Sequence, residues 1–262
     1  MPQTRTRLIA GQQRHLHGYR PGRYDPRDHK FELHVRPIRK PPQAEVNPSV
    51  LSIVFDQGDL GSCVANGNVM LWETVRRILG NPEVEMSRLW LYAKGRDLEG
   101  TPLDEDSGMQ VRDALKVMAS LGLPHEELWP YDISKFNVEP PAEADADAAQ
   151  HKILVYRACP SPDAIKQSII EGFPVVFGTT LYDSFESDET AQTGIIKAPG
   201  PTEAVVGGHC MVIIGYDDQR RLFHLRNSYG TGWGEEGDGW LDYWYFQSGA
   251  AGDAWTVRQE QV

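Results

Sequence analysis

The sequence predicts an α+β protein of two lobes, one mainly helical and the other rich in strands. Apolar residues recur at three- and four-residue steps in the first half, and short runs of Val, Ile and aromatic residues fill the second. An acidic stretch, poor in large apolar side chains, separates the two halves. We expect a basic N-terminal arm over residues 1–45, a helical lobe over 46–150 and a strand-rich lobe over 151–262.

Helical periodicity and stop signals place four helices. They are expected at residues 64–79, 87–98, 110–121 and 163–170. Gly80 ends the first pattern, Ser87 suits the N-cap of the second, and Gly122 follows the third. The acidic residues 139–149 are expected to form an exposed connection.

Short apolar runs bounded by Gly, Pro and Asp predict the strands of the second half. They cover residues 153–156, 174–180, 210–216, 222–226 and 240–246. The last run is strongly aromatic, and we expect it to be a terminal strand packed on its lobe rather than a ligand platform. Because a groove between two lobes is a common place for a site, the chemistry is expected there.

Composition excludes several classes of protein. Three cysteines in 262 residues cannot staple a small secreted fold, and a net charge of −11 argues against a general nucleic-acid binder. The sequence has neither a secretory apolar region nor a continuous apolar run long enough to cross a membrane. We therefore expect a monomer that is cytoplasmic, or exported without a classical signal peptide, and that binds neither nucleic acid nor membranes.

The nucleophile candidate is Cys63, in the segment Gln57-Gly58-Asp59-Leu60-Gly61-Ser62-Cys63. This cysteine begins the first predicted helix, where free backbone amides and the helix dipole favour a thiolate. Gln57 precedes it on the approach loop and has an amide that can donate to an oxyanion beside Cys63. A single cysteine is more often a buried apolar side chain, so the assignment depends on partners elsewhere in the chain.

Suitable partners lie in the second half. His209 opens an apolar strand 146 residues after Cys63, and Asn227 ends the next strand, 18 residues later. Cysteine as nucleophile, histidine as base and asparagine as the group that orients the imidazole form a known catalytic set. A Gly-rich turn that carries Trp233 follows the asparagine. Together the three segments predict acyl transfer through a thiol.

These segments resemble the papain family of cysteine peptidases over nearly all of residues 50–262. The resemblance implies a papain-like two-lobe fold, with a helical lobe, an antiparallel β-barrel-like lobe and the active site in the cleft between them. It implies an endopeptidase that needs no cofactor and forms a thioester with a peptide substrate. Cys63 and His209 would be the catalytic pair, with Gln57 in the oxyanion hole, Asn227 orienting His209, and Trp233 shielding the histidine–asparagine bond.

The resemblance also implies a set of substrate-binding residues. These are Gly108, Met109, Gly178, Gly207, Gly208 and Cys210. The sequence departs from the family at three positions: Leu60 stands where a disulfide cysteine is usual, Val64 where an aromatic residue is usual, and Tyr229 where tryptophan is common. The missing disulfide fits a reducing compartment, and the sequence is most similar to bacterial members.

The sequence also leaves functions other than peptide hydrolysis open. The same thioester can be resolved by an amine, which would make the protein a transpeptidase or amidase, and a silent site would leave a peptide-binding module. We expect no metal, because the cysteines and histidines include no Cys-x-x-Cys or His-x-x-x-His pair. Cys159 is expected to be a bystander.

The charge is unevenly distributed along the chain. Residues 1–40 carry ten arginines and lysines against three acids, a net charge of +7, which leaves −18 for the remainder. Such a segment is either a loose arm or one that docks on its own acidic body. Because peptidases of the resembled family often carry an N-terminal segment in the cleft, we expect residues 1–42 to cover part of the site and restrain activity, partly by salt-sensitive attraction.

Overall fold

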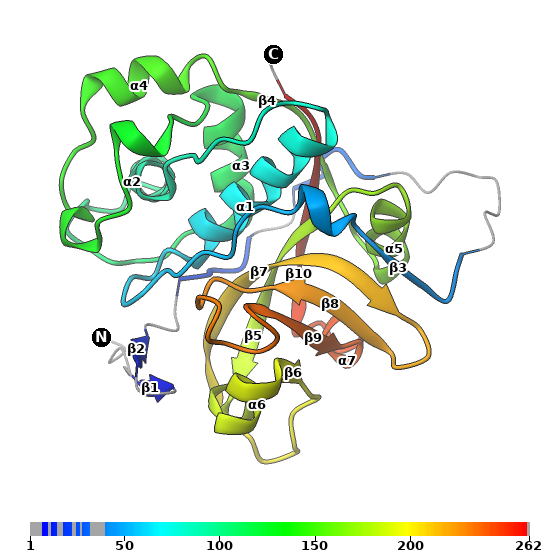
Figure 1. Ribbon diagram of the computed structural model, residues 1–262. Coiled ribbons are helices and arrows are strands. Elements are labelled where there is room, and N and C mark those ends of the chain that lie inside the picture. The colour runs from blue at the N-terminus through cyan, green and yellow to red at the C-terminus, as the bar shows by residue number, and fades with distance from the viewer. Residues whose placement is uncertain are drawn as a thin grey trace.

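The structure is a computed structural model that describes residues 7–9, 12–14, 18–22, 25–26, 28–31 and 40–260. The remainder of the predicted N-terminal arm lies outside these residues. The helices are α1 (Cys63–Ile78), α2 (Arg88–Leu98), α3 (Val111–Ser120), α4 (Ala142–Ala148), α5 (Pro162–Ile170), α6 (Asp188–Thr193) and α7 (Trp244–Gln247). Figure 1 shows α2, α3 and α4 on one side of α1 and the large sheet on the other.

The strands are β1 (Arg7–Ile9), β2 (Gln12–Arg14), β3 (Gln43–Glu45), β4 (Ile153–Ala158), β5 (Val175–Tyr182), β6 (Ile195–Ile196), β7 (Val205–Asp217), β8 (Leu222–Arg226), β9 (Asp238–Asp242) and β10 (Ala251–Glu260). Short 3-10 turns η1 to η4 lie at Pro48–Val50, Glu126–Leu128, Ile133–Lys135 and Asp183–Glu186. Within the described residues, β1 pairs with β2, and the other strands form one eight-stranded sheet.

Helix α1 lies between the two lobes. Its residues from Cys63 to Val75 are buried, because one side packs on α2 and α3 while another packs on β7 and β10. Its buried asparagines remain hydrogen-bonded, as where Asn68 Nδ2 donates to the Val64 carbonyl at 2.9 Å. Contacts on both sides fix the direction of the helix axis. The N-terminus of α1 is thereby held at the boundary between lobes.

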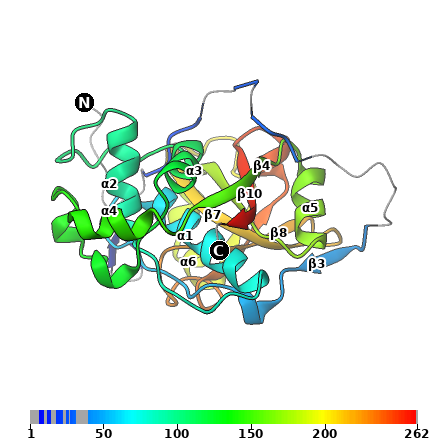
Figure 2. The same cartoon turned by 90° about the horizontal axis from the view of Figure 1, so that it is seen from above.

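The sheet runs in the order β4, β10, β5, β7, β8, β9, β6, and β3 adds to β7. Its pairings are antiparallel except for β6 with β9. Figure 2 shows α5 on the flank of the sheet away from α2 and α4. The sheet ends at β4 and β6 and does not close on itself, so the lobe is an open, mostly antiparallel sheet. The predicted α+β class is confirmed, with an open sheet in place of the expected barrel-like lobe.

The positions of the four predicted helices are confirmed to within one residue at each end. Ser87 caps α2 as expected, its side chain accepting a hydrogen bond from the Trp90 amide at 3.1 Å. The strand predicted at 222–226 coincides with β8. Among the described residues, no helix is long and apolar enough to cross a membrane.

The segment 139–149, expected to be an exposed connection, contains a helix, α4, that was not predicted. Ala144 and Ala148, one turn apart, are fully buried, so the helix packs a face of small side chains on the lobe. Asp145 fixes it further by accepting a hydrogen bond from Trp90 Nε1 at 2.8 Å. The alanines that make the stretch look non-globular are also strong helix formers.

The predicted strand at 240–246 is also wrong beyond its first three residues. Strand β9 ends at Asp242, whose carboxylate accepts a hydrogen bond from the Trp244 amide at 2.8 Å and starts α7. The terminal strand is instead β10, which lies between β4 and β5. In the sequence, glycine and charged residues hide the alternation of apolar and polar side chains along this strand.

Candidate active site

Cys63 is the first residue of α1 and is fully buried. Burial raises the pKa of its thiol to about 12, while hydrogen bonds from the backbone of Cys210, Val64 and Gly18 act to lower it. The contact with Cys210 places the sulfur beside β7, next to the residue that carries the imidazole. The predicted position of Cys63 at the start of a helix at the lobe boundary therefore agrees with the structure.

His209 lies on β7, and Asn227 follows the end of the neighbouring strand β8. The imidazole Nε2 and Asn227 Oδ1 are 2.7 Å apart, so Nε2 carries the proton and donates it to the amide oxygen. His209 Nδ1 is buried and makes no hydrogen bond within the described residues. Burial lowers the pKa of His209 to about 4, against the opposing effect of the bond to Asn227.

Gln57 is buried on the loop before α1, where its position is fixed from two directions. Its Oε1 accepts a hydrogen bond from Ser228 Oγ at 2.7 Å, and its Nε2 donates to the Leu60 carbonyl at 2.9 Å. The backbone N–H of Gln57 also donates to the Ser228 carbonyl at 2.9 Å. An amide group has two N–H bonds. The bond to Leu60 uses one of them, which leaves the second N–H for another acceptor.

Aromatic rings of the strand-rich lobe cover the imidazole of His209. The ring centroids of Tyr229 and His209 are 4.9 Å apart, and that of Phe185 lies 5.9 Å from His209. Trp233 is buried one ring further out, 6.4 Å from Tyr229 and 6.2 Å from Phe185. Of these three rings, that of Tyr229 lies nearest the imidazole, at the position where the family commonly has tryptophan, and shielding of the histidine–asparagine bond by Trp233 stays a prediction.

Two residues that the sequence analysis missed brace the nucleophile loop. Both carboxylate oxygens of Asp106 accept from the Gly61 N–H, at 3.1 and 3.0 Å. Tyr131 donates its hydroxyl to the Gln57 carbonyl at 2.9 Å and also contacts Ser62 Oγ. All three cysteines are free, so these hydrogen bonds hold a loop that carries no disulfide. The only sequence signal was the position of Asp106 beside Ser107-Gly108-Met109.

We expect Tyr131→Phe to lower the free energy of unfolding by about 1–2 kcal/mol, because it leaves the buried Gln57 carbonyl and Ser62 hydroxyl without that partner. Thermal denaturation should show a lower midpoint than for Tyr156→Phe, a matched change on β4 away from the site. The rate of alkylation at Cys63 should fall as well. Equal midpoints for the two variants would contradict the bracing role.

The N-terminal arm passes directly over this site. The Met109 N–H donates to the Gly18 carbonyl at 2.8 Å, and the Arg20 N–H donates to the Met109 carbonyl at 3.1 Å, which forms a parallel bridge centred on Tyr19. Gly18 is buried, and a β-carbon added to it would lie 2.7 Å from Cys63 Sγ. Residues 18–20 therefore fill the space in front of the thiol.

The side chain of Tyr19 occupies a pocket between the lobes. A β-carbon on Gly178 would lie 2.1 Å from its ring, and one on Gly208 would lie 3.1 Å from it. Burial raises the pKa of the Tyr19 hydroxyl, and negative charge at Asp253 acts in the same direction. Glycines at 178 and 208 are thus required for a ring of this size to fit.

The predicted substrate-binding residues lie close to one another around the segment 18–20. Met109 bonds to it through its backbone, Gly108 has a φ of +67° and would clash with Gly18 if it carried a β-carbon, and Gly178 pairs with Cys210 across β5 and β7. Gly207 lies next to Gly208 on β7, opposite Leu181. Cys210 is fully buried.

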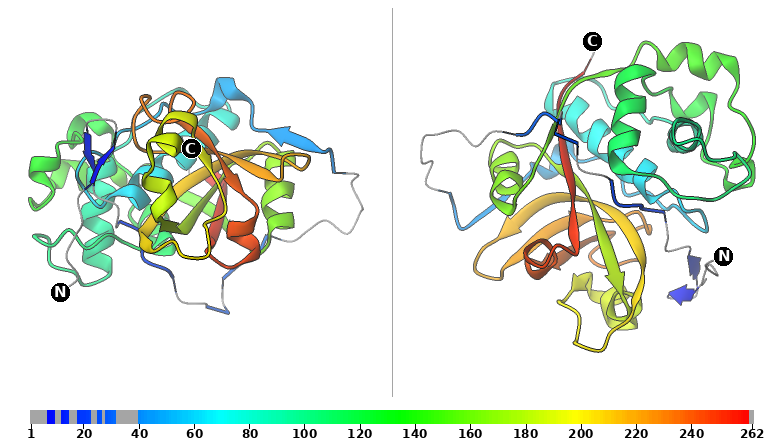
Figure 3. Two further views of the ribbon diagram at one scale, coloured as in Figure 1. Left: turned by 90° about the horizontal axis from the view of Figure 1, so that it is seen from below. Right: turned by 180° about the vertical axis from the view of Figure 1, so that it is seen from behind.

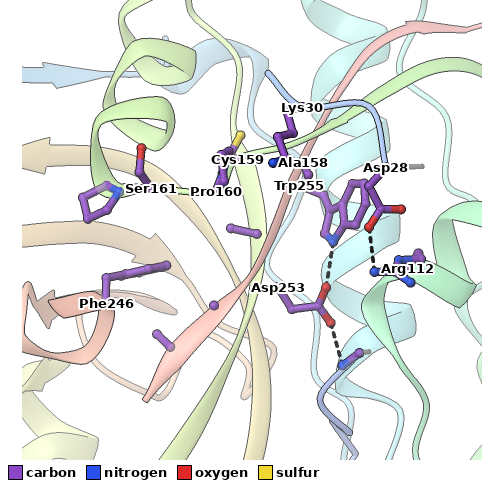
Figure 4. A pocket seen from close by; sticks show the side chains of 15 residues that line it. Asp28, Lys30, Arg112, Ala158, Cys159, Pro160, Ser161, Phe246, Asp253 and Trp255 are labelled. Atoms are coloured by element: carbon purple, nitrogen blue, oxygen red, sulfur yellow. Dashed lines mark hydrogen bonds and ion pairs between the residues drawn. The ribbon is translucent and has the colours of Figure 1, made fainter. Parts of the chain in front are cut away.

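Further contacts hold the arm on both lobes. The Gly22 N–H donates to Asp253 Oδ2 at 3.2 Å, and Asp28 forms an ion pair with Arg112 at 2.7 Å; Figure 4 shows both acidic residues at a cavity of about 290 Å³ between the arm and β10. The Phe31 N–H donates to the Ala158 carbonyl at 2.8 Å. Figure 3 shows the described pieces of the arm crossing β10 at the back of the molecule.

The buried thiol of Cys63 lies beside β7, the strand that carries the imidazole bonded to Asn227, as is expected of a two-lobed thiol peptidase. The model of the papain family cysteine proteases matches residues 42–251. The chain belongs to this family and is a papain-like cysteine protease.

Individual relatives agree with this assignment. The chain is 34% identical over 223 residues to an uncharacterized peptidase C1-like protein of Acanthamoeba polyphaga mimivirus, which covers 81% of this chain and 71% of that protein. It is 24% identical to a cysteine protease of Blomia tropicalis over 73% of this chain and 58% of the relative.

Solved structures show the same fold. Xylellain, a cysteine protease from Xylella fastidiosa, is 31% identical and superimposes with a TM-score of 0.83 over 93% of this chain and 96% of its own. Digestive procathepsin L 3 of Tenebrio molitor, at 17% identity, has a TM-score of 0.69 over 88% of this chain and 73% of its own, which shows similarity of fold.

Proposed function

We propose that this papain-family protease is an endopeptidase in which Cys63 is the nucleophile, His209 the acid and base, Asn227 the group that orients the imidazole, and Gln57 an oxyanion donor. The observation that carries the proposal is the 2.7 Å bond between His209 Nε2 and Asn227 Oδ1. It directs the protonated nitrogen away from the reacting groups and leaves Nδ1, which has no other partner among the described residues, to exchange a proton with the thiol.

The reaction follows from these positions. The Cys63 thiol transfers its proton to His209 Nδ1, and the thiolate attacks the carbonyl carbon of a peptide bond. The Cys63 backbone N–H and the available N–H of Gln57 Nε2 stabilise the oxyanion. His209 then protonates the departing amine, which leaves a thioester. Water, deprotonated by His209, cleaves the thioester and releases the acid.

We propose further that the segment 18–22 keeps the enzyme latent. The Gly18 carbonyl is bonded to the Met109 N–H, and it is the Gly18 backbone N–H that acts on the Cys63 thiol. The sulfur therefore faces an amide hydrogen instead of a carbonyl carbon, so the arm fills the site without being positioned for attack. Tyr19 fills the side-chain pocket at the same time.

The ionic state of the covered site supports latency. A Cys63 pKa raised to about 12 and a His209 pKa lowered to about 4, both mainly by burial, mean that thiol and imidazole are neutral at pH 7. The thiol, unlike the thiolate, is a poor nucleophile. Release of the arm would return water to the site and allow the helix dipole and the imidazolium to stabilise the thiolate.

The pocket that holds Tyr19 indicates what a substrate would place there. Its walls are the glycines at 178 and 208 and the buried Met109, so it accepts a large, flat side chain. We propose that peptides with an aromatic residue two positions before the scissile bond are preferred.

We also propose that the chain is divided into an N-terminal arm, a helical lobe and a strand-rich lobe, over residues 1–45, 46–150 and 151–262.

Active-site titration with the epoxide inhibitor E-64 tests the assignment. One equivalent should label Cys63, and dipeptidyl fluorogenic substrates should be hydrolysed by the released enzyme. Peptide binding without labelling would instead identify a silent binding module. Product analysis with an added amine separates hydrolysis from transfer, because a transferase gives the amide as its main product.

We expect Asn227→Ala to lower kcat about tenfold, because the hydrogen bond that orients the imidazole, of about 1–1.5 kcal/mol, is lost. The loss should be limited, since packing against Tyr229 and Phe185 still restrains the His209 ring. Steady-state kinetics compared with Gln219→Ala, on the exposed turn after β7, would measure this. A rate equal to that of the control would show that Asn227 does not orient the base.

A further inference from the structure

Two histidines and an aspartate meet on the outer side of the helical lobe. His125 precedes η2, Asp147 lies in the last turn of α4, and His151 follows that helix. His125 Nδ1 is 3.0 Å from Asp147 Oδ2, and His151 Nε2 is 3.7 Å from Asp147 Oδ1. One ligand atom from each of the three residues can be chosen so that all lie within 4.8 Å of one another. None of these residues takes part in the proposed peptidase site.

The backbone holds these side chains in place. The His125 N–H donates to Asp147 Oδ2 at 2.9 Å, the His151 N–H donates to the Ala148 carbonyl at 2.9 Å, and the Leu123 N–H donates to the His151 carbonyl at 3.1 Å. The preceding Gly122 has a φ of +96° and packs so closely that a β-carbon would lie 1.8 Å from the Ala148 carbonyl oxygen. The two segments are therefore fixed relative to each other without a metal.

The donor set and its spacing are those of a zinc site. Zinc binds imidazole nitrogen and carboxylate oxygen at about 2.0–2.2 Å in a tetrahedron, which places neighbouring ligand atoms about 3.3 Å apart. His125 Nδ1 is 3.0 Å from one carboxylate oxygen of Asp147 and His151 Nε2 is 3.7 Å from the other, and these distances lie on either side of that value.

We propose that His125, Asp147 and His151 bind one zinc ion, which joins α4 to the loop before η2. The side chains are 34%, 25% and 21% exposed, so an ion can enter and the fourth position is open to water. Glu85 and Glu127 line a hollow beside His125 and add negative charge near the entrance. Arg76, by contrast, places a positive charge near His151, which opposes the binding of a cation.

Sequence spacing conceals this site. Asp147 and His151 are four residues apart, whereas His125 lies 22 residues before Asp147. A search for paired histidines or cysteines at short spacing does not find such a set. The fold brings the third ligand to the other two because Leu123 and His125 bond to the end of α4 and the residues after it.

Zinc binding to the full-length chain tests the proposal. The background variant Cys63→Ala removes the thiol at the other site that a soft metal would seek. Isothermal titration with zinc should give one site, and His151→Ala or Asp147→Asn should weaken it by at least about tenfold, because even outer-shell partners of metal ligands are worth that much. Zinc should also raise the thermal midpoint of the background chain and not that of the His151→Ala chain.

Two controls separate this site from adventitious binding. His224→Ala removes a histidine outside the cluster, whose Nδ1 lies 3.2 Å from Glu45 Oε1. The double variant His15→Ala with His17→Ala removes two imidazoles from the arm. Both should bind zinc like the background chain. Unchanged affinity in His151→Ala and Asp147→Asn, or loss in the arm variant alone, would overturn the proposal.

The zinc site can still be tested if a ligand variant fails to fold. X-ray absorption of the zinc-loaded background chain should show two imidazoles and a carboxylate at about 2.0–2.2 Å from the metal. Sulfur in the coordination sphere, or fewer than two imidazoles, would overturn the site without any ligand variant. Absence of zinc binding to the background chain would show that the three residues form an ion-pair cluster only.

Discussion

Cys63→Ala should lower kcat/KM for dipeptidyl fluorogenic substrates by about 10⁴-fold or more. Cys63 supplies the thiol that forms the proposed thioester, and loss of a nucleophile typically removes most of the rate enhancement. Labelling by E-64 should disappear with the activity. Initial rates with the released enzyme and mass spectrometry of the inhibitor adduct would measure the two effects.

Cys159→Ala is the matched control for this variant. Cys159 is also free and buried, and burial likewise raises its pKa to about 12, but it lies after β4 and away from the N-terminus of α1. Its replacement should leave activity and labelling unchanged. Full activity in Cys63→Ala would rule out the thiol mechanism.

Gly18→Val should activate the full-length chain about 10- to 100-fold, although it changes no residue of the catalytic set. A β-carbon at position 18 would lie 2.2 Å from the Gly61 carbonyl oxygen and 2.7 Å from Cys63 Sγ. Overpacking of this kind costs roughly 1–3 kcal/mol, which raises the population of the released state by the corresponding factor. The rate of E-64 labelling without proteolytic processing is the measurement.

Pro26→Val, on an exposed part of the arm, is the control and should leave the labelling rate unchanged. Raised ionic strength should speed labelling of the unsubstituted chain, because ion pairs of Arg20 with Glu99 and of Asp28 with Arg112 hold the arm. If Gly18→Val is no faster than the control and salt has no effect, the arm does not restrain the enzyme.

Charge attraction accounts for the docking of the arm only in part. Arg20 follows the expected pattern, a basic arm residue on an acidic partner, Glu99. The pair of Asp28 with Arg112 reverses it, since here the arm contributes the acid. What places the arm at the thiol is the backbone pairing of residues 18–20 with Met109 and the fit of Tyr19 over Gly178, which net charge does not encode.

The sequence alone determined the family and the order of the catalytic segments, because these depend on local rules. A cysteine at a helix start, a histidine on an apolar strand and an asparagine at a strand end can each be recognised within a few residues. The helices that carry an apolar stripe, such as α1 and α3, were placed for the same reason. Periodicity reports a buried face directly.

Only the tertiary structure decided which distant residues share a site. Tyr131 and Asp106 reach the nucleophile loop from more than forty residues away, and His125 meets Asp147 and His151 across the end of a helix that composition had hidden. Tyr229, not Trp233, lies against the imidazole because the turn after β8 directs that ring inward. Contacts between segments depend on packing, which a single sequence records only indirectly.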